Sequence, residues 1–146
     1  VYVQNASVTD STLAPEGCST IYVLVPIANT RAGINWTSVK DEYREKILDI
    51  IETRGGLTDI RQHIVTETML TPDDFEQEKY VFDGAIFNLA HTVDQMLIMR
   101  PHNEFEEIGN LYLVGGGTHP GSGLPTIYES GRISAGLILK RDAWYL

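Results

Sequence analysis

The chain has 146 residues, of which 42% are hydrophobic and 21% charged, and its formal net charge is -9 at pH 7. This composition is typical of a globular domain, and no apolar run approaches the roughly 20 residues needed to cross a bilayer. The negative charge argues against nucleic-acid binding, because phosphates require positive charge at the binding surface. Cys18 is the single cysteine, so no disulfide can form within the chain.

The first elements expected along the chain are two strands. Residues 1–4, VYVQ, alternate apolar and other side chains, and residues 20–26 contain the apolar, β-branched run IYVLV. Both patterns are typical of strands, and the turn-rich stretch between them is short enough to bring them together. We therefore expect the two segments to be neighbours in one sheet.

A helix is expected next, beginning at Thr37 or Ser38. Apolar side chains recur at helical spacing from this point, so one face of the helix would be apolar. Asp41 lies three residues after Ser38, and this pair resembles a capping box. Gly55 is expected to end the helix.

The next part of the chain predicts a strand, a short helix and another strand. Residues 63–70 alternate weakly, as a strand does. The sequence Thr-Pro-Asp-Asp that follows is a strong helix start, because proline is tolerated at the first helical position. This helix is expected to run through Gln77, and residues 79–87 are expected to form the second strand.

Residues 110–125, NLYLVGGGTHPGSGLP, are the most informative part of the sequence. The apolar run 111–114 predicts a strand buried on both faces, as in a parallel sheet. The glycines at 115–117 leave the backbone open to close approach by a ligand. A helix is predicted to begin at Leu124 or Pro125, where the missing N–H of proline has no cost.

The amino end of this last helix is a candidate binding site. Its unpaired N–H groups and partial positive charge would stabilise an anionic or electron-rich group, and flavin carbonyls and phosphates both fit that description. Small side chains along the helix would allow close packing against a strand or a cofactor. The candidate binding residues are Gly115, Gly116, Gly117, Thr118, His119, Gly121, Ser122, Gly123, Leu124 and Pro125.

Other kinds of site are excluded or left open by the same residues. Ser122 and Gly123 stand where a phosphate loop needs lysine and serine or threonine, and the dinucleotide glycine fingerprint is also incomplete. The four histidines lack metal-ligand spacing, and no G-x-S-x-G hydrolase elbow is present. A glycine turn between a strand and a helix also occurs in α/β folds that bind nothing there.

The run NLYLVGGGTHPGSGLPTIYESG, residues 110–131, resembles the C-terminal signature of bacterial-type phytoene desaturases, which are flavin-dependent carotenoid desaturases. Looser similarity covers residues 7–26 and 87–105, so the resemblance extends over most of the chain. Members of this family begin with a Rossmann-like glycine motif, and no such motif occurs here. The resemblance therefore implies the C-terminal portion of a longer enzyme.

The resemblance implies an α/β fold, with an α+β substrate region, from a two-domain FAD-dependent oxidoreductase. Residues 1–109 would belong mostly to the substrate-binding region. Residues 110–146 would return to the FAD-binding domain, where a final strand, turn and helix complete a Rossmann-like parallel sheet. The N-terminal Rossmann-like part would be absent from these residues.

The resemblance also implies the reaction and its partners. A long polyene hydrocarbon such as phytoene would be dehydrogenated in carotenoid biosynthesis, with a hydride passing to FAD and a proton being lost. Such an enzyme is expected in the cytoplasm, with peripheral membrane association to reach its lipid-soluble substrate. No metal and no catalytic base is assigned in these residues.

Two further assignments and one alternative function complete the expectations. Arg100 and His102 resemble a family segment near the substrate cavity and are assigned to the substrate, although an arginine before proline also suits a solvated turn. His119 would either face the flavin or fix the loop, and Gly116 would contact the flavin by its backbone N–H. The alternative is a self-standing α/β binding or scaffold module without catalytic activity.

Overall fold

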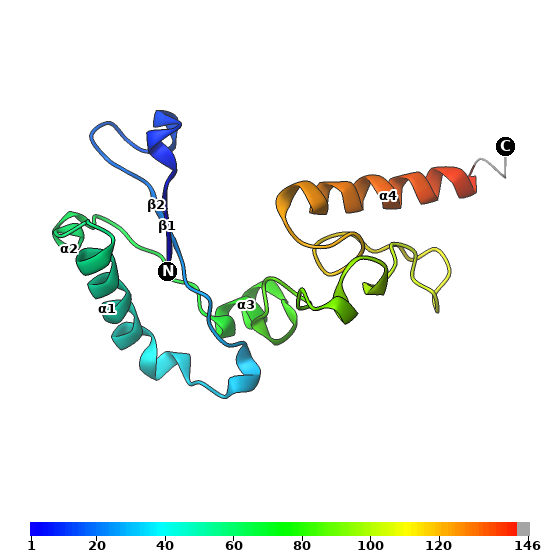
Figure 1. Ribbon diagram of the computed structural model, residues 1–146, viewed down its shortest axis with the longest axis horizontal. Coiled ribbons are helices and arrows are strands. Elements are labelled where there is room, and N and C mark those ends of the chain that lie inside the picture. Colours follow the sequence, from blue (N-terminus) through cyan, green and yellow to red (C-terminus); the bar gives the residue numbers. More distant parts are fainter. Residues whose placement is uncertain (143–146) are drawn as a thin grey trace. The chain divides into compact units, whose positions relative to one another are not determined.

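The computed structural model describes residues 1–142 and divides the chain into two compact units, Val1–Gly84 and Ala85–Leu146. The described residues form a two-stranded antiparallel sheet, four α-helices and several short 3-10 helices (Figure 1). The chain is thus an α/β structure with little sheet. Among the described helices, none is long and apolar enough to cross a membrane.

The strands of the first unit form the pair that the sequence predicts. β1 (Tyr2–Asn5) pairs antiparallel with β2 (Ile21–Leu24) in the register Tyr2 to Leu24 (Figure 1). The Tyr2 and Tyr22 rings are diagonal neighbours across the two strands and make an edge-to-face contact, with 6.4 Å between their centroids. Cross-strand aromatic pairs of this kind stabilise a hairpin. The prediction of neighbouring strands is confirmed.

The predicted long helix is also present as α1 (Trp36–Arg54), and it ends before Gly55 as expected. The predicted capping box is wrong. The helix begins one residue before the earlier predicted start, after Asn35, and Asn35 makes no side-chain capping bond. Ser38 therefore lies inside the first turn, where its hydroxyl donates to the Asn35 carbonyl oxygen at 2.8 Å.

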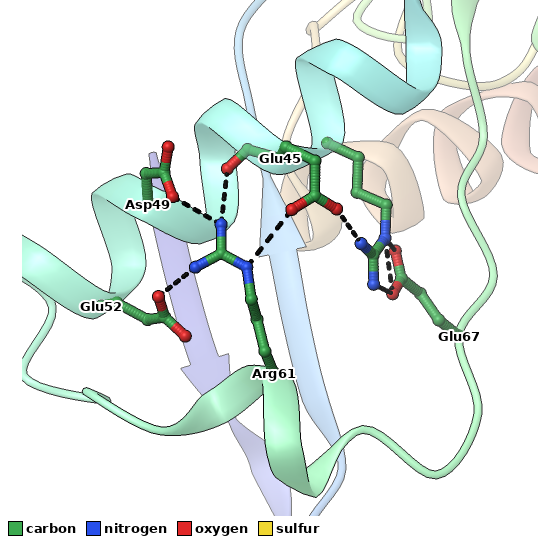
Figure 2. A network of polar contacts seen from close by, with 6 residues as sticks. Glu45, Asp49, Glu52, Arg61 and Glu67 are labelled. Atoms are coloured by element: carbon green, nitrogen blue, oxygen red, sulfur yellow. Dashed lines mark hydrogen bonds and ion pairs between the residues drawn. The ribbon is translucent and has the colours of Figure 1, made fainter.

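A network of ion pairs joins α1 to α2 (Ile60–His63) and to the chain that follows it (Figure 2). The Arg61 guanidinium contacts carboxylates on three successive turns of α1, with 2.5 Å to Asp49. The hydrogen bond that Arg61 donates to Asp49 and the charges of the neighbouring carboxylates raise the pKa of Arg61. The groups of the network are Arg44, Glu45, Asp49, Glu52, Arg61 and Glu67.

α3 (Pro72–Lys79) confirms the predicted helix start and extends two residues beyond the predicted end. Thr71 and Asp74 form a capping box, in which the Asp74 carboxylate accepts from the Thr71 N–H and hydroxyl, both at 2.7 Å. These hydrogen bonds lower the pKa of Asp74. A Cβ added to Gly84 would lie 2.3 Å from the Pro72 carbonyl oxygen, so the chain passes closely over the start of this helix.

Two predicted strands of the first unit are wrong. Residues 63–70 contain the last residue of α2 and then irregular chain, since no neighbouring segment offers them a ladder. Residues 79–87 contain the end of α3 and a 3-10 helix at Phe82–Gly84. Tyr80 and Asp83 adopt positive φ there, which a continuous strand does not permit.

The second unit consists mostly of turns and the long helix α4 (Leu124–Asp142), shown in orange and red in Figure 1. The helix begins at Leu124 with Pro125 in its first turn, as the sequence predicts. Residues 111–114 do not form the predicted strand. Within the described residues they make only an isolated antiparallel bridge between Glu104 and Tyr112, and Val114 is 65% exposed.

Candidate cofactor-binding site

The candidate site is the loop of residues 115–123, here called the glycine loop, together with the amino end of α4. The loop leads from the extended segment 111–114 directly into the helix. The first helical hydrogen bond beyond the loop runs from the Ile127 N–H to the Gly123 carbonyl oxygen at 2.9 Å. The N–H groups of Ser122 and Gly123 have no hydrogen-bond acceptor among the described residues, so they are available to a ligand or solvent.

Arg100 lies beneath the glycine loop and is 2% exposed. Its guanidinium donates from Nη1 to the Gly116 carbonyl oxygen at 2.9 Å and from Nη2 to the Leu89 carbonyl oxygen at 3.3 Å. A Cβ added to Gly121 would lie 3.3 Å from Arg100 Nε, so the loop folds tightly over this side chain. No carboxylate among the described residues pairs with Arg100, whose charge is therefore held by two backbone carbonyls.

Asn103 and two serines of α4 attach the helix to the start of the loop. The Asn103 side-chain amide donates to the Ser130 hydroxyl at 3.1 Å, and that hydroxyl also accepts from the Gly115 N–H at 3.1 Å. One turn further, the Ser134 hydroxyl donates to the Leu113 carbonyl oxygen at 2.7 Å. All three polar side chains are buried, so these bonds fix the angle at which the chain enters the loop.

The middle of the loop is attached to Pro101. The Thr118 hydroxyl and the His119 N–H both donate to the Pro101 carbonyl oxygen, at 2.5 Å and 2.9 Å. Further along, the Ser122 hydroxyl lies 2.6 Å from His91 Nε2. The residues just before the signature therefore act as a platform for it.

The space around the loop can be judged from the atoms that a Cβ added to each glycine would contact. Cβ atoms added at Gly116 and Gly117 would meet Ser122 Cβ at 3.3 Å and Asn88 Oδ1 at 2.9 Å. An added Cβ would therefore crowd the loop against itself at Gly116 and would displace the end of the Asn88 side chain at Gly117. At Gly115 no atom lies within 4 Å of the added Cβ, so that position is open.

A cleft of about 610 Å³ in the second unit brings two candidate histidines together. His102 and His119 both line it, next to Phe105 and Leu137. His102 Nδ1 lies 3.2 Å from the Glu106 carboxylate. The cleft thus places His102 near the loop histidine, whereas Arg100 is buried and does not line it.

Sequence reasoning missed most of the residues that support the loop. The small residues of α4 were expected to allow close packing, and this holds for Ser130 and Ser134. At Gly131 and Gly136 an added Cβ would meet no described atom within 4 Å, so no packing reason for these glycines is found here. The serine pair at i and i+4 was the available signal for a buried polar face. The supporting residues that were missed are Asn88, His91 and Asn103.

Together these groups suit an electron-rich ligand at the amino end of α4. The helix dipole, the two loop N–H groups without a described acceptor and the buried guanidinium all favour negative charge there. The loop is narrow and already packed by the chain at three glycines, so a ligand would contact its outer backbone rather than enter it. The residues present therefore fit one edge of a flavin or its diphosphate.

The chain is similar to curated carotenoid desaturases along almost its whole length. It is 56% identical over 140 residues to a 4,4'-diapophytoene desaturase (4,4'-diapolycopene-forming) of Methylomonas sp, covering 96% of this chain and 27% of that protein. It is 46% identical to an all-trans-zeta-carotene desaturase of Myxococcus xanthus, covering 92% of this chain and 25% of that protein. It is 39% identical to a phytoene desaturase (lycopene-forming) of Pantoea ananas, covering 96% of this chain and 28% of that protein.

No family model matches the chain. The curated relatives nevertheless agree with one another in the chemistry that their names give, and the matches include the glycine loop because they cover nearly all residues. The chain spans about a quarter of the length of these relatives. The chain therefore belongs to the family of bacterial-type phytoene and related carotenoid desaturases.

Proposed function

We propose that the full-length protein containing this chain is an FAD-dependent carotenoid desaturase. The observation that carries the proposal is the 56% identity over 140 residues to a 4,4'-diapophytoene desaturase. Relatives at lower identity act on phytoene or zeta-carotene according to their names, so the common substrate class is a long polyene hydrocarbon. The product is a more conjugated carotenoid.

The glycine loop and the amino end of α4 would bind FAD. The backbone N–H groups of Ser122 and Gly123 supply donors, and the helix supplies a partial positive charge. Bound flavin supplies the capacity to accept a hydride from the substrate. This chain's own contribution is binding and orientation, and Arg100 and Asn103 hold the loop in the shape that makes this possible.

The predicted domain division fits this assignment. Residues 1–109 would belong mainly to the substrate region, and residues 110–146 would complete the parallel sheet of the FAD domain. Val114, Leu124 and Tyr128 are 65%, 71% and 76% exposed, which is a large apolar exposure around the start of one helix. Exposed apolar side chains of this size suit a surface that another part of the protein covers. A flavin domain built around segment 111–114 would cover it.

The substrate has no polar group, so it requires an apolar tunnel. The cleft lined by His102 and His119 also carries Glu104 and Glu106, and carboxylates do not suit a hydrocarbon. We therefore place the polyene outside this cleft, with His102 as a candidate near the entrance to the substrate site. A lipid-soluble substrate also favours a cytoplasmic enzyme that associates peripherally with the membrane.

The alternative of a self-standing binding or scaffold module is not favoured. A separate module would be expected to match unrelated proteins that share only that module. The matches described above are instead desaturases of three different carotenoid substrates, and each match covers at least 92% of this chain.

The experiment uses the full-length protein with a polyene substrate dispersed in liposomes. The wild-type protein is expected to purify with FAD and to form a more conjugated product, measured by absorbance and chromatography. Gly121→Val adds a branched side chain at φ +137, 3.3 Å from Arg100, and Gly116→Asp adds a carboxylate against Ser122. Both variants are expected to lose FAD.

Gly109→Ala is the matched control, because an added Cβ there meets no described atom within 4 Å. It is expected to retain FAD. Full flavin stoichiometry in both loop variants would contradict the assignment of the loop to FAD. A flavin-free wild-type protein that leaves every polyene unchanged would contradict the proposed function as a whole.

A further inference from the structure

The strongest unexplained feature of the second unit is the buried charge of Arg100. An arginine remains protonated in proteins, and moving a cation out of water costs several kcal/mol unless opposite charge offsets it. Arg100 is 2% exposed, and its hydrogen-bond partners among the described residues are two neutral carbonyl oxygens. Among residues 1–142, no carboxylate lies within ion-pair distance of it.

Holding the loop in place does not by itself require a charge. A neutral side chain could donate to the Gly116 carbonyl oxygen, as Asn103 does to Leu113 and Ser130 in the same unit. The Asn103 amide and the Ser130 and Ser134 hydroxyls, which also bond to this part of the chain, are neutral. Arg100 differs from them because it carries a charge. A negative charge from outside residues 1–142 would offset the cost of burying this cation.

The position of Arg100 identifies where that charge would lie. Its Nη1 is bonded to Gly116, near the beginning of the loop, and its Nε faces Gly121, near the end. The loop therefore lies around the guanidinium and leads into the amino end of α4. Ser122 and Gly123, whose N–H groups lack a described acceptor, are the next two residues after Gly121. Cation, helix dipole and N–H donors act on one small region.

We infer that Arg100 is a positioning residue that supplies the positive charge for an anionic group of the flavin cofactor held on the glycine loop. The inference rests on the proposed function and moves Arg100 from the substrate to the cofactor. Because the guanidinium lies beneath the backbone, it acts through the loop rather than by contact. Two groups have the required chemistry: the diphosphate of FAD, and the flavin ring when it carries a negative charge.

The test compares Arg100→Gln with Arg100→Lys in the full-length protein. Both variants lose the guanidinium fork, but only glutamine loses the charge, so their difference reports the charge. Each flavin-free protein is titrated with FAD and with riboflavin, which lacks phosphate. Each flavin-loaded protein is titrated with sulfite, whose adduct places negative charge on the flavin ring.

The glutamine variant is expected to bind either FAD or sulfite about tenfold more weakly than the lysine variant does. A change of this size is expected when a charge that acts at short range in a partly buried site is lost. Weaker FAD binding with unchanged riboflavin binding identifies the diphosphate. Weaker sulfite binding identifies the ring. Equal affinities of the two variants for FAD and for sulfite would overturn the inference and leave Arg100 as a neutral clamp.

A second pair of variants keeps the test decisive if Arg100→Gln does not fold. Leu89 is 38% exposed, and its carbonyl oxygen accepts from Arg100. Leu89→Glu adds a carboxylate to the residue whose backbone carbonyl oxygen accepts from the guanidinium, and Leu89→Gln is the neutral control. The glutamate variant is expected to lose affinity relative to the control, and equal affinities would overturn the inference. A wild-type protein that binds neither flavin contradicts the proposed function instead.

Discussion

The two units are stabilised by different kinds of interaction. The first unit buries Trp36, Leu48 and Ile51, and several of its charged groups form ion pairs at the surface (Figure 2). The second unit buries polar side chains, which bond to backbone groups around one loop. These buried polar residues are Arg100, Asn103, Thr118, Ser130 and Ser134.

The difference indicates how strictly each unit has to define its local geometry. Surface ion pairs contribute little free energy and tolerate change, because water and salt screen them. Buried polar groups are costly unless every partner is present, so they define one loop geometry strongly. The second unit is thus organised around the candidate site. Four predictions test this comparison, measured in the full-length protein.

The largest effect is expected where backbone passes closest to backbone in the first unit. Gly84→Ala places a Cβ 2.3 Å from the Pro72 carbonyl oxygen at φ +62. Left-handed backbone and steric overlap together should destabilise this unit by about 3 kcal/mol. Gly33→Ala is the matched control, since it has φ +66 and open space, and should cost about 1 kcal/mol. Hydrogen exchange of peptides from residues 1–84 measures both, and equal costs would refute the close approach.

The next effect concerns a buried amide of the second unit. Asn103→Leu keeps the approximate volume but removes the bonds to Leu113 and Ser130, and should cost about 2 kcal/mol. Asn35→Leu is the control, because Asn35 is exposed and makes no side-chain capping bond. Hydrogen exchange should rise in peptides from residues 100–142 for the first variant alone. Equal exchange in both variants would show that buried polar bonds do not hold this unit.

A smaller effect depends on pH. Hydrogen bonds from Thr71 lower the pKa of Asp74, so its capping contribution is present above its ordinary value of 3.8 and is lost as pH falls through the lowered value. Asp74→Asn should therefore cost about 1 kcal/mol at pH 7 and progressively less below about pH 3.8. Urea midpoints at pH 7, 5 and 3 measure this dependence. Asp73→Asn keeps the capping box and serves as control, and a cost independent of pH would contradict the assignment.

The smallest effect is expected at the surface network. Arg61→Met removes all its ion pairs but keeps an apolar stem against α1, so hydrogen exchange in α1 should change by no more than about twofold. The change should disappear in 1 M salt, where charges are screened. Lys46→Met, which removes the exposed pair with Glu42, is a control of similar kind. A large, salt-independent loss of hydrogen-exchange protection in Arg61→Met would show that the first unit, like the second, depends strongly on its polar contacts.

The sequence by itself determined the local elements whose signals lie within a few residues. The alternating runs around Tyr2 and Tyr22, the Thr71–Asp74 cap and Pro125 at the start of α4 each define a turn of structure through neighbouring groups. The resemblance of the glycine loop to a family was also readable, because it depends on residue identity alone.

Only the tertiary structure decided which residues support the loop and why its glycines are needed. Arg100 and Asn103 bond to groups that lie 16 and 27 residues away, and no local pattern announces such contacts. A strand likewise needs a partner, and segment 111–114 has only one bridge among the described residues. Local hydrogen bonds and periodicity can be predicted from neighbouring residues, whereas buried polar contacts depend on how distant segments meet.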